Sequence, residues 1–247
     1  MKNKIMDLGY SSVEVDELIK VSKDLEKDYE LLKKEYPIQY LIGYVNFYGY
    51  KINVNESVLI PRYETEYLVE KTIKYINNIF GDKKIDIVDL GCGSGCISIT
   101  LSKKTNSNVT GIDISPIALE VAKKNSKENN TYIKFIENDM LDNIDDKFDV
   151  IISNPPYISH DEYVMDRVKL YEPALALYAD NKGLYFYEKI LKNIKKNLKG
   201  KYLIAFEIGL TQASDISKMI SEYLPNDKYY VEKDLTNRDR YIFITNA

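Results

Sequence analysis

Residues 85–95 read Ile-Asp-Ile-Val-Asp-Leu-Gly-Cys-Gly-Ser-Gly, an apolar run that ends in a cluster of glycines. A short apolar run without alternation is typical of a parallel strand that is covered on both faces. Glycines directly after it permit a tight turn into a helix, and they let backbone N–H groups approach a ligand without obstruction by Cβ atoms. The stretch therefore predicts a strand, a ligand-binding turn and a helix.

Strands and helices continue to alternate beyond this stretch. We predict strands at Ile85–Asp89, Asn108–Asp113, Tyr132–Glu137, Phe148–Ser153 and Lys201–Glu207. We predict helices at Ser94–Lys103, Pro116–Glu128, Gly183–Leu198 and Thr211–Tyr223. Two last strand-like runs, Tyr229–Asp234 and Arg240–Thr245, would form an antiparallel pair at the end of the sheet. This order predicts an α/β fold, a doubly wound Rossmann-like sheet of seven strands with an antiparallel end.

Three elements are expected before the sheet. Between about Ser11 and Tyr36, apolar residues recur at helical spacing, namely Leu18, Val21, Leu25, Tyr29 and Leu32. They predict a helix that is docked on the main domain or, alternatively, belongs to a partner-binding module. Tyr44–Val54 alternates and predicts a β-hairpin that turns at Gly49. Glu64–Phe80 predicts an amphipathic helix closed by Gly81. We accordingly divide the chain into a short helical segment (1–36), a β-hairpin linker (37–60) and an α/β domain (61–247).

The composition argues against several classes of protein. The chain has 247 residues, a net charge of −4 and a pI near 5.3, so it lacks the excess of positive charge with which proteins bind the phosphates of nucleic acids. No segment approaches the ~20 apolar residues of a membrane span, and the start has no apolar run of signal length. We therefore expect a cytoplasmic protein that binds neither membrane nor nucleic acid.

Cys92 and Cys96 are the only cysteines, and His160 is the only histidine. The C-x-x-x-C spacing matches neither a zinc site nor a redox motif, so we expect no metal site and two small buried thiols beside the glycine turn. Group transfer by this chain would therefore need an organic cofactor.

The residues around the glycines indicate which cofactor. Cys96 stands where the last glycine of the nicotinamide G-x-G-x-x-G motif would be. Asp89 leads the glycines, where a carboxylate would repel a pyrophosphate and attract an ammonium group. S-adenosyl-L-methionine carries that ammonium group and no phosphate, and we predict it as the cofactor.

Two further segments would complete this site. Asp113, about 20 residues beyond the glycines, can accept both hydroxyl groups of a ribose. Its alternative role is to cap the helix that begins near Pro116. The segment Asn138-Asp139-Met140, after the third predicted strand, would lie beside the adenine.

The stretch Ser153-Asn154-Pro155-Pro156-Tyr157 follows the fourth predicted strand, at the sheet edge where open α/β sheets bind ligands. Two prolines stiffen the loop and leave carbonyl oxygens as acceptors, the Asn154 amide adds an acceptor and donors, and the Tyr157 ring is a flat surface. These groups suit a planar substrate that carries an N–H. The alternative is merely a proline-stiffened turn.

The nitrogen of an amide or aromatic amine is a poor nucleophile. Its pKa as an acid lies roughly ten units above that of any carboxylate, so deprotonation by a side chain would require about 14 kcal/mol. Holding the nitrogen in line with the sulfonium methyl group can supply ~7–11 kcal/mol instead. Its two N–H groups would donate hydrogen bonds to the Asn154 side-chain oxygen and the Pro155 carbonyl. These bonds would favour the transition state, in which the nitrogen is partly cationic. We expect direct displacement without a classical general base.

Several segments in fixed order give the chain a family resemblance. They are Pro37–Gly43, Phe47–Gly49, Val58–Glu66, Asn154–Tyr157, Tyr171–Leu175 and Gly183–Leu184. Together they resemble the protein glutamine N5-methyltransferases of the HemK/PrmC family, over about Pro37 to Ala247. The resemblance implies a class I S-adenosylmethionine-dependent methyltransferase that modifies the glutamine of the Gly-Gly-Gln motif in class 1 peptide chain release factors and releases S-adenosyl-L-homocysteine. We expect it to act as a monomer.

The same resemblance assigns the site residues. The cofactor would contact Asp89, Leu90, Gly91, Cys92, Gly93, Asp113, Met140 and Asn154. The catalytic and glutamine-holding residues would be Asn154, Pro155, Pro156 and Tyr157. Arg62 and Glu64 would close over the site from the hairpin side, or form only a surface salt bridge.

The sequence departs from the family pattern in three places. Tyr63 replaces a proline in the segment that begins at Arg62, and Met140 stands where an aromatic residue is common. About 36 residues precede the hairpin, which gives room for one or two helices where family members have several.

Two other functions stay open at this point. The Asn-Pro-Pro-Tyr loop is shared with methyltransferases that act on adenine N6 or guanine N2 of nucleic acids, but these would need a basic face or a recognition domain. A non-catalytic scaffold that binds the cofactor is the other alternative, and binding without turnover would identify it.

Overall fold

The sequence pattern of buried strands produces a central seven-stranded sheet in the computed structural model, which describes residues 1–247. The strands are β3 (Ile85–Leu90), β4 (Ser107–Asp113), β5 (Ile133–Glu137), β6 (Phe148–Ser153), β7 (Leu198–Glu207), β8 (Lys228–Lys233) and β9 (Asp239–Thr245). Their spatial order is β5-β4-β3-β6-β7-β9-β8. Neighbours from β5 to β7 pair in parallel, and β9 is antiparallel to both β7 and β8. The predicted sheet and its antiparallel end are confirmed.

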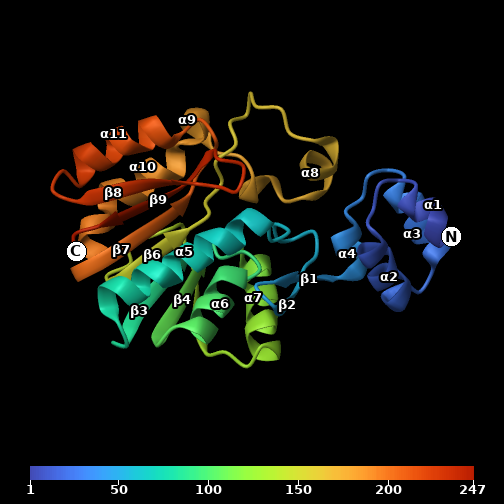
Figure 1. Cartoon of the computed structure of the whole chain (residues 1–247), viewed down its shortest axis with the longest axis horizontal. Coiled ribbons are helices and arrows are strands. Elements are labelled where there is room, and N and C mark those ends of the chain that lie inside the picture. The colour runs from blue at the N-terminus through green and yellow to red at the C-terminus, as the bar shows by residue number, and fades with distance from the viewer.

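Helices cover both faces of this sheet (Figure 1). One face packs against α5 (Tyr63–Phe80), α6 (Cys96–Lys104) and α7 (Pro116–Glu128), and the other against α10 (Tyr185–Asn193) and α11 (Ala213–Tyr223). Consecutive residues of one strand enter opposite cores: Ile87 lies in the first and Val88 in the second. The predicted helix Gly183–Leu198 is shorter than expected, because its last turn, Ile194–Asn197, is a 3₁₀ helix.

The last strand is inserted inside the sheet rather than added at its edge. Five consecutive residues at the end of β9 are buried, whereas β8 is largely exposed. An apolar run such as Tyr241–Ile244 must be covered on both faces, and only the inner position provides that cover. The more polar β8 is therefore left as the edge strand.

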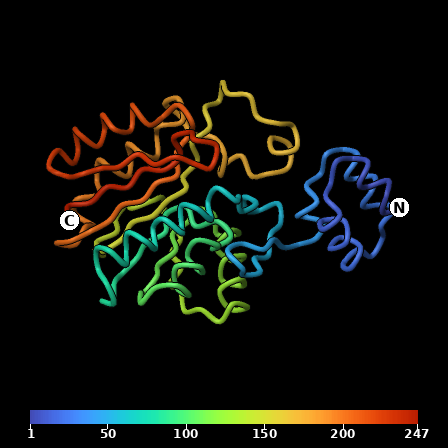
Figure 2. Tube along the Cα trace, viewed as in Figure 1, coloured from blue at the N-terminus to red at the C-terminus, as the bar shows by residue number.

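The N-terminal residues form a separate helical lobe (Figures 1 and 2). It consists of α1 (Lys2–Met6), α2 (Ser12–Val21), α3 (Leu25–Leu32) and α4 (Ile38–Ile42). The single helix predicted across this region is wrong, because Ser22 adopts an extended conformation and the Asp24 side chain caps a new helix by accepting from the Lys27 N–H.

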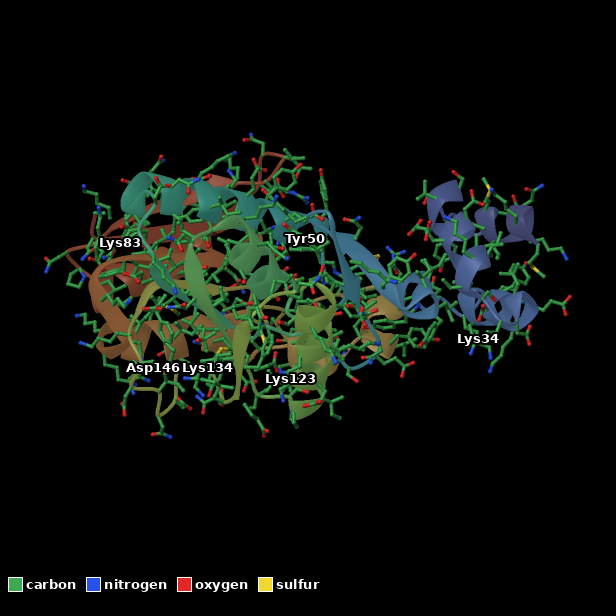
Figure 3. All side chains as sticks on the ribbon, turned by 90° about the horizontal axis from the view of Figure 1, so that it is seen from below. Lys34, Tyr50, Lys83, Lys123, Lys134 and Asp146 are labelled. Carbon is green, nitrogen blue, oxygen red and sulfur yellow. The ribbon has the colours of Figure 1, made fainter.

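The lobe packs on itself, around a core of Ile5, Val15, Leu18, Leu32 and Ile38. The interpretation of this region as a helix docked on the main domain is therefore also wrong. A perpendicular view shows the same separation: Lys34 lies on the lobe, whereas Tyr50, Lys83 and Lys123 lie on the larger body (Figure 3).

A hairpin joins the lobe to the body. Its strands are β1 (Tyr44–Phe47) and β2 (Tyr50–Asn53), and the turn residues Tyr48 and Gly49 have φ angles of 51° and 83°. Two left-handed residues make the type I′ turn that matches strand twist, so the predicted hairpin is confirmed. The Asn125 side chain of α7 accepts from the Asn53 backbone N–H at 2.8 Å and fastens the hairpin to the body.

A long segment after β6 is the part of the body that the sequence pattern did not predict. It contains α8 (Asp166–Tyr171), the 3₁₀ helix Ala174–Ala176 and α9 (Asp180–Gly183). The Tyr171 hydroxyl of α8 donates to the Lys34 carbonyl at 2.9 Å, and its ring meets Tyr36 edge-on at 5.0 Å. This segment therefore bridges the body and the lobe. No helix of the chain is both long and apolar enough to cross a membrane.

Candidate active site

A cavity of about 290 Å³ lies where β3, β4, β5 and β6 reach their carboxyl ends. The strand register aligns these ends, because Leu90 pairs with Ile112 on one side and with Ser153 on the other. Each strand contributes the residues that follow it: Gly91 and Gly93, Asp113, Asn138–Met140, and Asn154 with Pro156. Ser57, Leu59 and Tyr185 are among the other residues that line it. This is the switch point at which open α/β sheets bind ligands.

The glycine turn contributes space rather than hydrogen-bond donors. The N–H groups of Gly91 and Cys92 both donate to the Ile112 carbonyl, and the Gly93 N–H donates to Asp113 Oδ2 at 2.7 Å. The prediction that these N–H groups face a ligand is therefore wrong. A Cβ at Gly93 would meet no atom within 4 Å, and one at Gly91 would meet only Met140 Cε at 4.0 Å. Side chains at these positions would take up open space beside the cavity.

Asp89 is completely buried behind the glycine turn. Its Oδ2 accepts from the Ser98 N–H at 3.1 Å and from the Ser98 hydroxyl at 2.6 Å, while its Oδ1 is buried without a partner. Burial raises the pKa of Asp89 to about 7. A buried oxygen without a donor is unfavourable, so Oδ1 is an acceptor ready for a ligand donor.

Leu90 and Cys92 do not line the cavity, and their contact with a cofactor stays a prediction. The Leu90 side chain lies in the core shared with α10 and α11, and its carbonyl accepts from the Ser153 hydroxyl at 2.7 Å. Cys92 and Cys96 are both buried, as expected, and burial raises the pKa of both thiols.

Asp113 and Met140 lie on the cavity wall. The Asp113 carboxylate accepts from the N–H groups of Gly93 and Ser115, and burial raises its pKa. The alternative that Asp113 caps α7 is wrong, because the Ser115 side chain performs that role by accepting from the Ala118 N–H. Met140 is held in a left-handed turn (φ 53°) and its carbonyl accepts from the Asn138 side chain.

A second cavity, of about 90 Å³, adjoins the first. Leu59, Asn154 and Ala176 line both cavities. Within the Asn-Pro-Pro-Tyr loop, Pro155 and Tyr157 line the small cavity and Pro156 lines the large one. The loop therefore lies between the two spaces, with Asn154 at their junction.

Two oxygen atoms of the Asn-Pro-Pro-Tyr loop accept no hydrogen bond from the protein. Asn154 Nδ2 donates to the Thr65 hydroxyl at 3.0 Å, and no protein group donates to Asn154 Oδ1 or to the Pro155 carbonyl. The Tyr157 hydroxyl is directed at Glu207 Oε1 at 3.5 Å, and burial raises the pKa of Tyr157. His160 is exposed and pairs with Asp180, and it lines neither cavity.

Thr65 and Glu207 are the site residues that sequence reasoning missed. Glu207 ends β7 with 2% of its surface exposed, and burial raises its pKa to about 7. Its Oε2 accepts from the Thr65 hydroxyl at 2.8 Å. An acidic residue at the end of a predicted central strand was the available signal, since strand ends carry the site in this fold.

Arg62 and Glu64 have different positions. Arg62 lines the small cavity and pairs with Glu172, which also accepts from the Ile60 N–H at 3.1 Å. The alternative of a surface salt bridge is wrong for Arg62, because the Glu172 side chain is only 2% exposed. Glu64 is exposed and lines neither cavity, so the structure does not place it over the site as predicted.

Comparisons with known proteins agree with this arrangement. The family model described as Methyltransferase small domain matches residues 70–171, and that described as Eco57I restriction-modification methylase matches residues 122–230. A methyltransferase structure from Pyrococcus furiosus superposes with a TM-score of 0.60 at 16% identity, over 81% of this chain and 90% of that chain. At this identity the likeness shows the fold alone, and it confirms the class I methyltransferase fold.

Curated relatives are more similar. The release factor glutamine methyltransferase of Bacillus cereus is 39% identical over 84% of this chain and 75% of its own length. The protein of the same name from Lactococcus lactis subsp. lactis is 38% identical over 99% of this chain and 86% of its own length. With this identity over most of both chains, and with the strand-end cavities described above, the chain belongs to the release factor glutamine methyltransferase family.

Proposed function

We propose that this enzyme transfers the methyl group of S-adenosyl-L-methionine to the side-chain amide nitrogen of the glutamine in the Gly-Gly-Gln motif of class 1 peptide chain release factors. The relatives above are named release factor glutamine methyltransferase. The observation that carries the proposal in this structure is the junction at Asn154 of a cavity of about 290 Å³ with one of about 90 Å³. The large cavity would hold the methyl donor and the small one the amide.

The residues of the large cavity fit S-adenosyl-L-methionine, which supplies an electrophilic methyl group on a sulfonium centre when bound. Gly91 and Gly93 leave the space that a Cβ would fill. Asp113 presents a carboxylate that suits ribose hydroxyls. Met140 would contact the adenine through its thioether. Asp89 does not line this cavity, and its unpartnered Oδ1 behind the glycine turn would reach an ammonium group through a water molecule.

The small cavity favours a carboxamide over a nucleobase. It is about a third the size of the large cavity (about 90 against about 290 Å³), and a carboxamide is the smaller of the two groups. Asn154 Oδ1 and the Pro155 carbonyl would accept the two N–H protons of the amide. Tyr157 and Leu177 add an apolar wall.

The chain would act on the amide by orientation and electrostatics rather than by proton abstraction. Neither Glu207 nor His160 lines a cavity, and abstraction from a neutral amide would in any case require about 14 kcal/mol. The hydrogen bonds from the amide N–H groups to Asn154 Oδ1 and the Pro155 carbonyl would become stronger as the nitrogen gains positive charge. They therefore stabilise the transition state more than the bound amide.

The partner would reach the amide pocket through a third, larger space. This cleft of about 790 Å³ lies between the helical lobe and the segment around α8. Arg62, Ile158 and Val168 line both this cleft and the small cavity. A cleft of this size beside the amide pocket supports a protein loop as the substrate.

Mass spectrometry of purified class 1 release factor, incubated with the enzyme and labelled S-adenosyl-L-methionine, tests the proposal. We expect one added methyl group on the Gly-Gly-Gln glutamine, and none on a release factor in which that glutamine is replaced by glutamate. An unmodified release factor, together with cofactor binding shown by calorimetry, would contradict the proposal and direct the search to other proteins or nucleic acids.

A further inference from the structure

The side chain of Asn154 can present either its oxygen or its NH₂ group to the amide pocket, because a half-turn about its last bond exchanges the two. Only the oxygen can accept a substrate N–H. The proposed reaction therefore depends on something that selects one of the two orientations.

A short chain of hydrogen bonds makes this selection. Asn154 Nδ2 donates to Thr65 Oγ1 at 3.0 Å, and Thr65 Oγ1 donates to Glu207 Oε2 at 2.8 Å. Thr65 and Glu207 are 3% and 2% exposed, so water does not compete for these bonds. The sheet register places Glu207 there, since Ser153 at the end of β6 pairs with Phe206, and the residues that follow these two in the chain are Asn154 and Glu207.

The ionised carboxylate of Glu207 determines which group donates and which accepts in each of these two hydrogen bonds. An ionised Glu207 only accepts, and Thr65 has a single hydroxyl proton, which it gives to Glu207. The remaining lone pairs of Thr65 can only accept, so the group of Asn154 that faces Thr65 must be its NH₂. Asn154 Oδ1 is thereby left for the pocket.

We propose that Thr65 and Glu207 are positioning residues that hold the Asn154 amide with its oxygen toward the substrate. This inference rests on the proposed function for the role of the oxygen, but the orientation itself can be measured without turnover. Neither residue touches either cavity, and both act through Asn154.

Protonation of Glu207 would allow the chain to reverse. A protonated carboxyl can donate to Thr65, which then donates to Asn154 Oδ1 and turns the NH₂ group toward the pocket. Burial favours the protonated form, the charge of Arg240 opposes it, and the charge of Glu64 supports it. The Tyr157 hydroxyl faces the same carboxyl, and Tyr187 and Tyr241 lie nearby, donating to the backbone carbonyls of Glu207 and Glu64.

The first test compares Thr65→Val with Thr72→Val. Thr72 is a matched control because it is fully buried on the same helix, and its hydroxyl donates to the Leu68 carbonyl away from the site. We expect Thr65→Val to lower kcat about tenfold, equivalent to the ~1.4 kcal/mol of one hydrogen bond, with KM for S-adenosyl-L-methionine unchanged. Thr65→Ser should restore kcat, and Thr72→Val should leave it unchanged. Equal kcat values for the two valine variants, or no rescue by serine, would overturn the proposal.

The second test uses Glu207→Gln and the pH profile of kcat. The wild-type profile should fall on the acid side near neutral pH, and the variant should lack that fall because it has no proton to gain. An identical acid limb in both proteins would overturn the proposal.

A third measurement separates this inference from the proposed function. Side-chain amide exchange of Asn154, followed by NMR in the absence of substrate and assigned by comparison with Asn154→Ala, should be slow in the wild type and fast in Thr65→Val. Slow exchange with no methylation of release factors would reject the function and keep the orientation. Fast exchange in the wild type would reject the orientation.

Discussion

The chemistry that we propose converges on one side chain. Asn154 is the residue of the Asn-Pro-Pro-Tyr loop that lines both cavities, and its Oδ1 has no donor within the protein. Pro155 and Pro156 fix the backbone on its C-terminal side, so the amide is presented from a rigid support. A rigid acceptor needs little reorganisation as charge develops on the substrate nitrogen.

Substitution of Asn154 by alanine should therefore separate catalysis from cofactor binding. We expect kcat to fall by about 10²–10³-fold, the loss found when one preorganised hydrogen-bonding group is removed, with little change in the Kd for S-adenosyl-L-methionine. Kinetics and calorimetry measure the two quantities. A parallel loss of cofactor affinity would mean that the residue serves the cofactor instead.

Two buried carboxyl groups make stability depend on pH. Burial raises the pKa of both Glu207 and Asp89 to about 7, above their ordinary values of 4.5 and 3.8. The folded protein then binds more protons than the unfolded chain between those ordinary values and pH 7. The free energy of unfolding consequently falls as the pH rises through this window.

Urea unfolding of the cofactor-free protein at pH 5 and pH 7.5 measures this effect. We expect the wild type to be less stable at pH 7.5, and Glu207→Gln to lose about 2 kcal/mol of that difference because glutamine does not titrate. Glu222→Gln, which removes an exposed glutamate of α11 that does not influence Glu207, is the control. A Glu207→Gln protein with the wild-type pH dependence would show that Glu207 is ionised throughout this range.

At the scale of elements, the Asn-Pro-Pro-Tyr loop depends on a turn far along the chain. Asn181, Lys182 and Gly183 are consecutive left-handed residues that enter α10, and Gly183 lies directly against the backbone of Tyr157. The Tyr157 carbonyl also accepts from Gln212 Nε2 at 2.9 Å. The close approach requires a residue without a Cβ at position 183.

Gly183→Ala should therefore damage the loop and the fold together. Its Cβ would lie 2.0 Å from the Tyr157 carbonyl oxygen, on a backbone with φ +81° that alanine already disfavours. We expect a loss of at least ~3 kcal/mol in the free energy of unfolding, measured by urea denaturation. Gly200→Ala, where a Cβ meets nothing within 4 Å, should cost less than about 1 kcal/mol. Similar losses for both variants would contradict this packing.

At the scale of the whole molecule, the lobe and the body differ in the size of their cores. The lobe has a core of 5 buried residues, whereas the body has two clusters of 23 and 22. A small core buries little apolar surface, so local opening of the lobe requires less free energy than global unfolding. The lobe is also one wall of the cleft through which we propose the partner enters.

Hydrogen exchange should reveal this difference. We expect amide protons of α2 and α3 to exchange faster than those of β3, β6 and β7 in the free enzyme, with opening free energies several kcal/mol below the global value. Addition of the release factor should protect α2 and α3 if the cleft is the entry route. Protection in the free enzyme equal to that of the central strands would show that the lobe and the body unfold as one unit.

Local patterns in the residue order were sufficient for the fold class, the strands from Ile85 onward, the hairpin that turns at Gly49 and the loop at Asn154–Tyr157. These features depend on periodicity, turn chemistry and proline geometry, which act over a few residues. The N-terminal region was misread for the same reason. The apolar stripe continues across Ser22–Asp24 and therefore looks like one helix. In the structure, the Asp24 cap begins a second helix, and α2 and α3 pack against each other.

The partners within the site were decided by tertiary structure. Sheet register brings Glu207 beside Asn154, helix α5 brings Thr65 between them, and the turn at Gly183 supports Tyr157 from another element. Packing also buries the side chains of Leu90 and Cys92 away from the cavity walls, Glu64 is exposed outside them, and the N–H groups of Gly91 and Gly93 are bonded within the protein. Such contacts join residues tens of positions apart, and they form only when burial and hydrogen bonding are satisfied over the whole molecule at once.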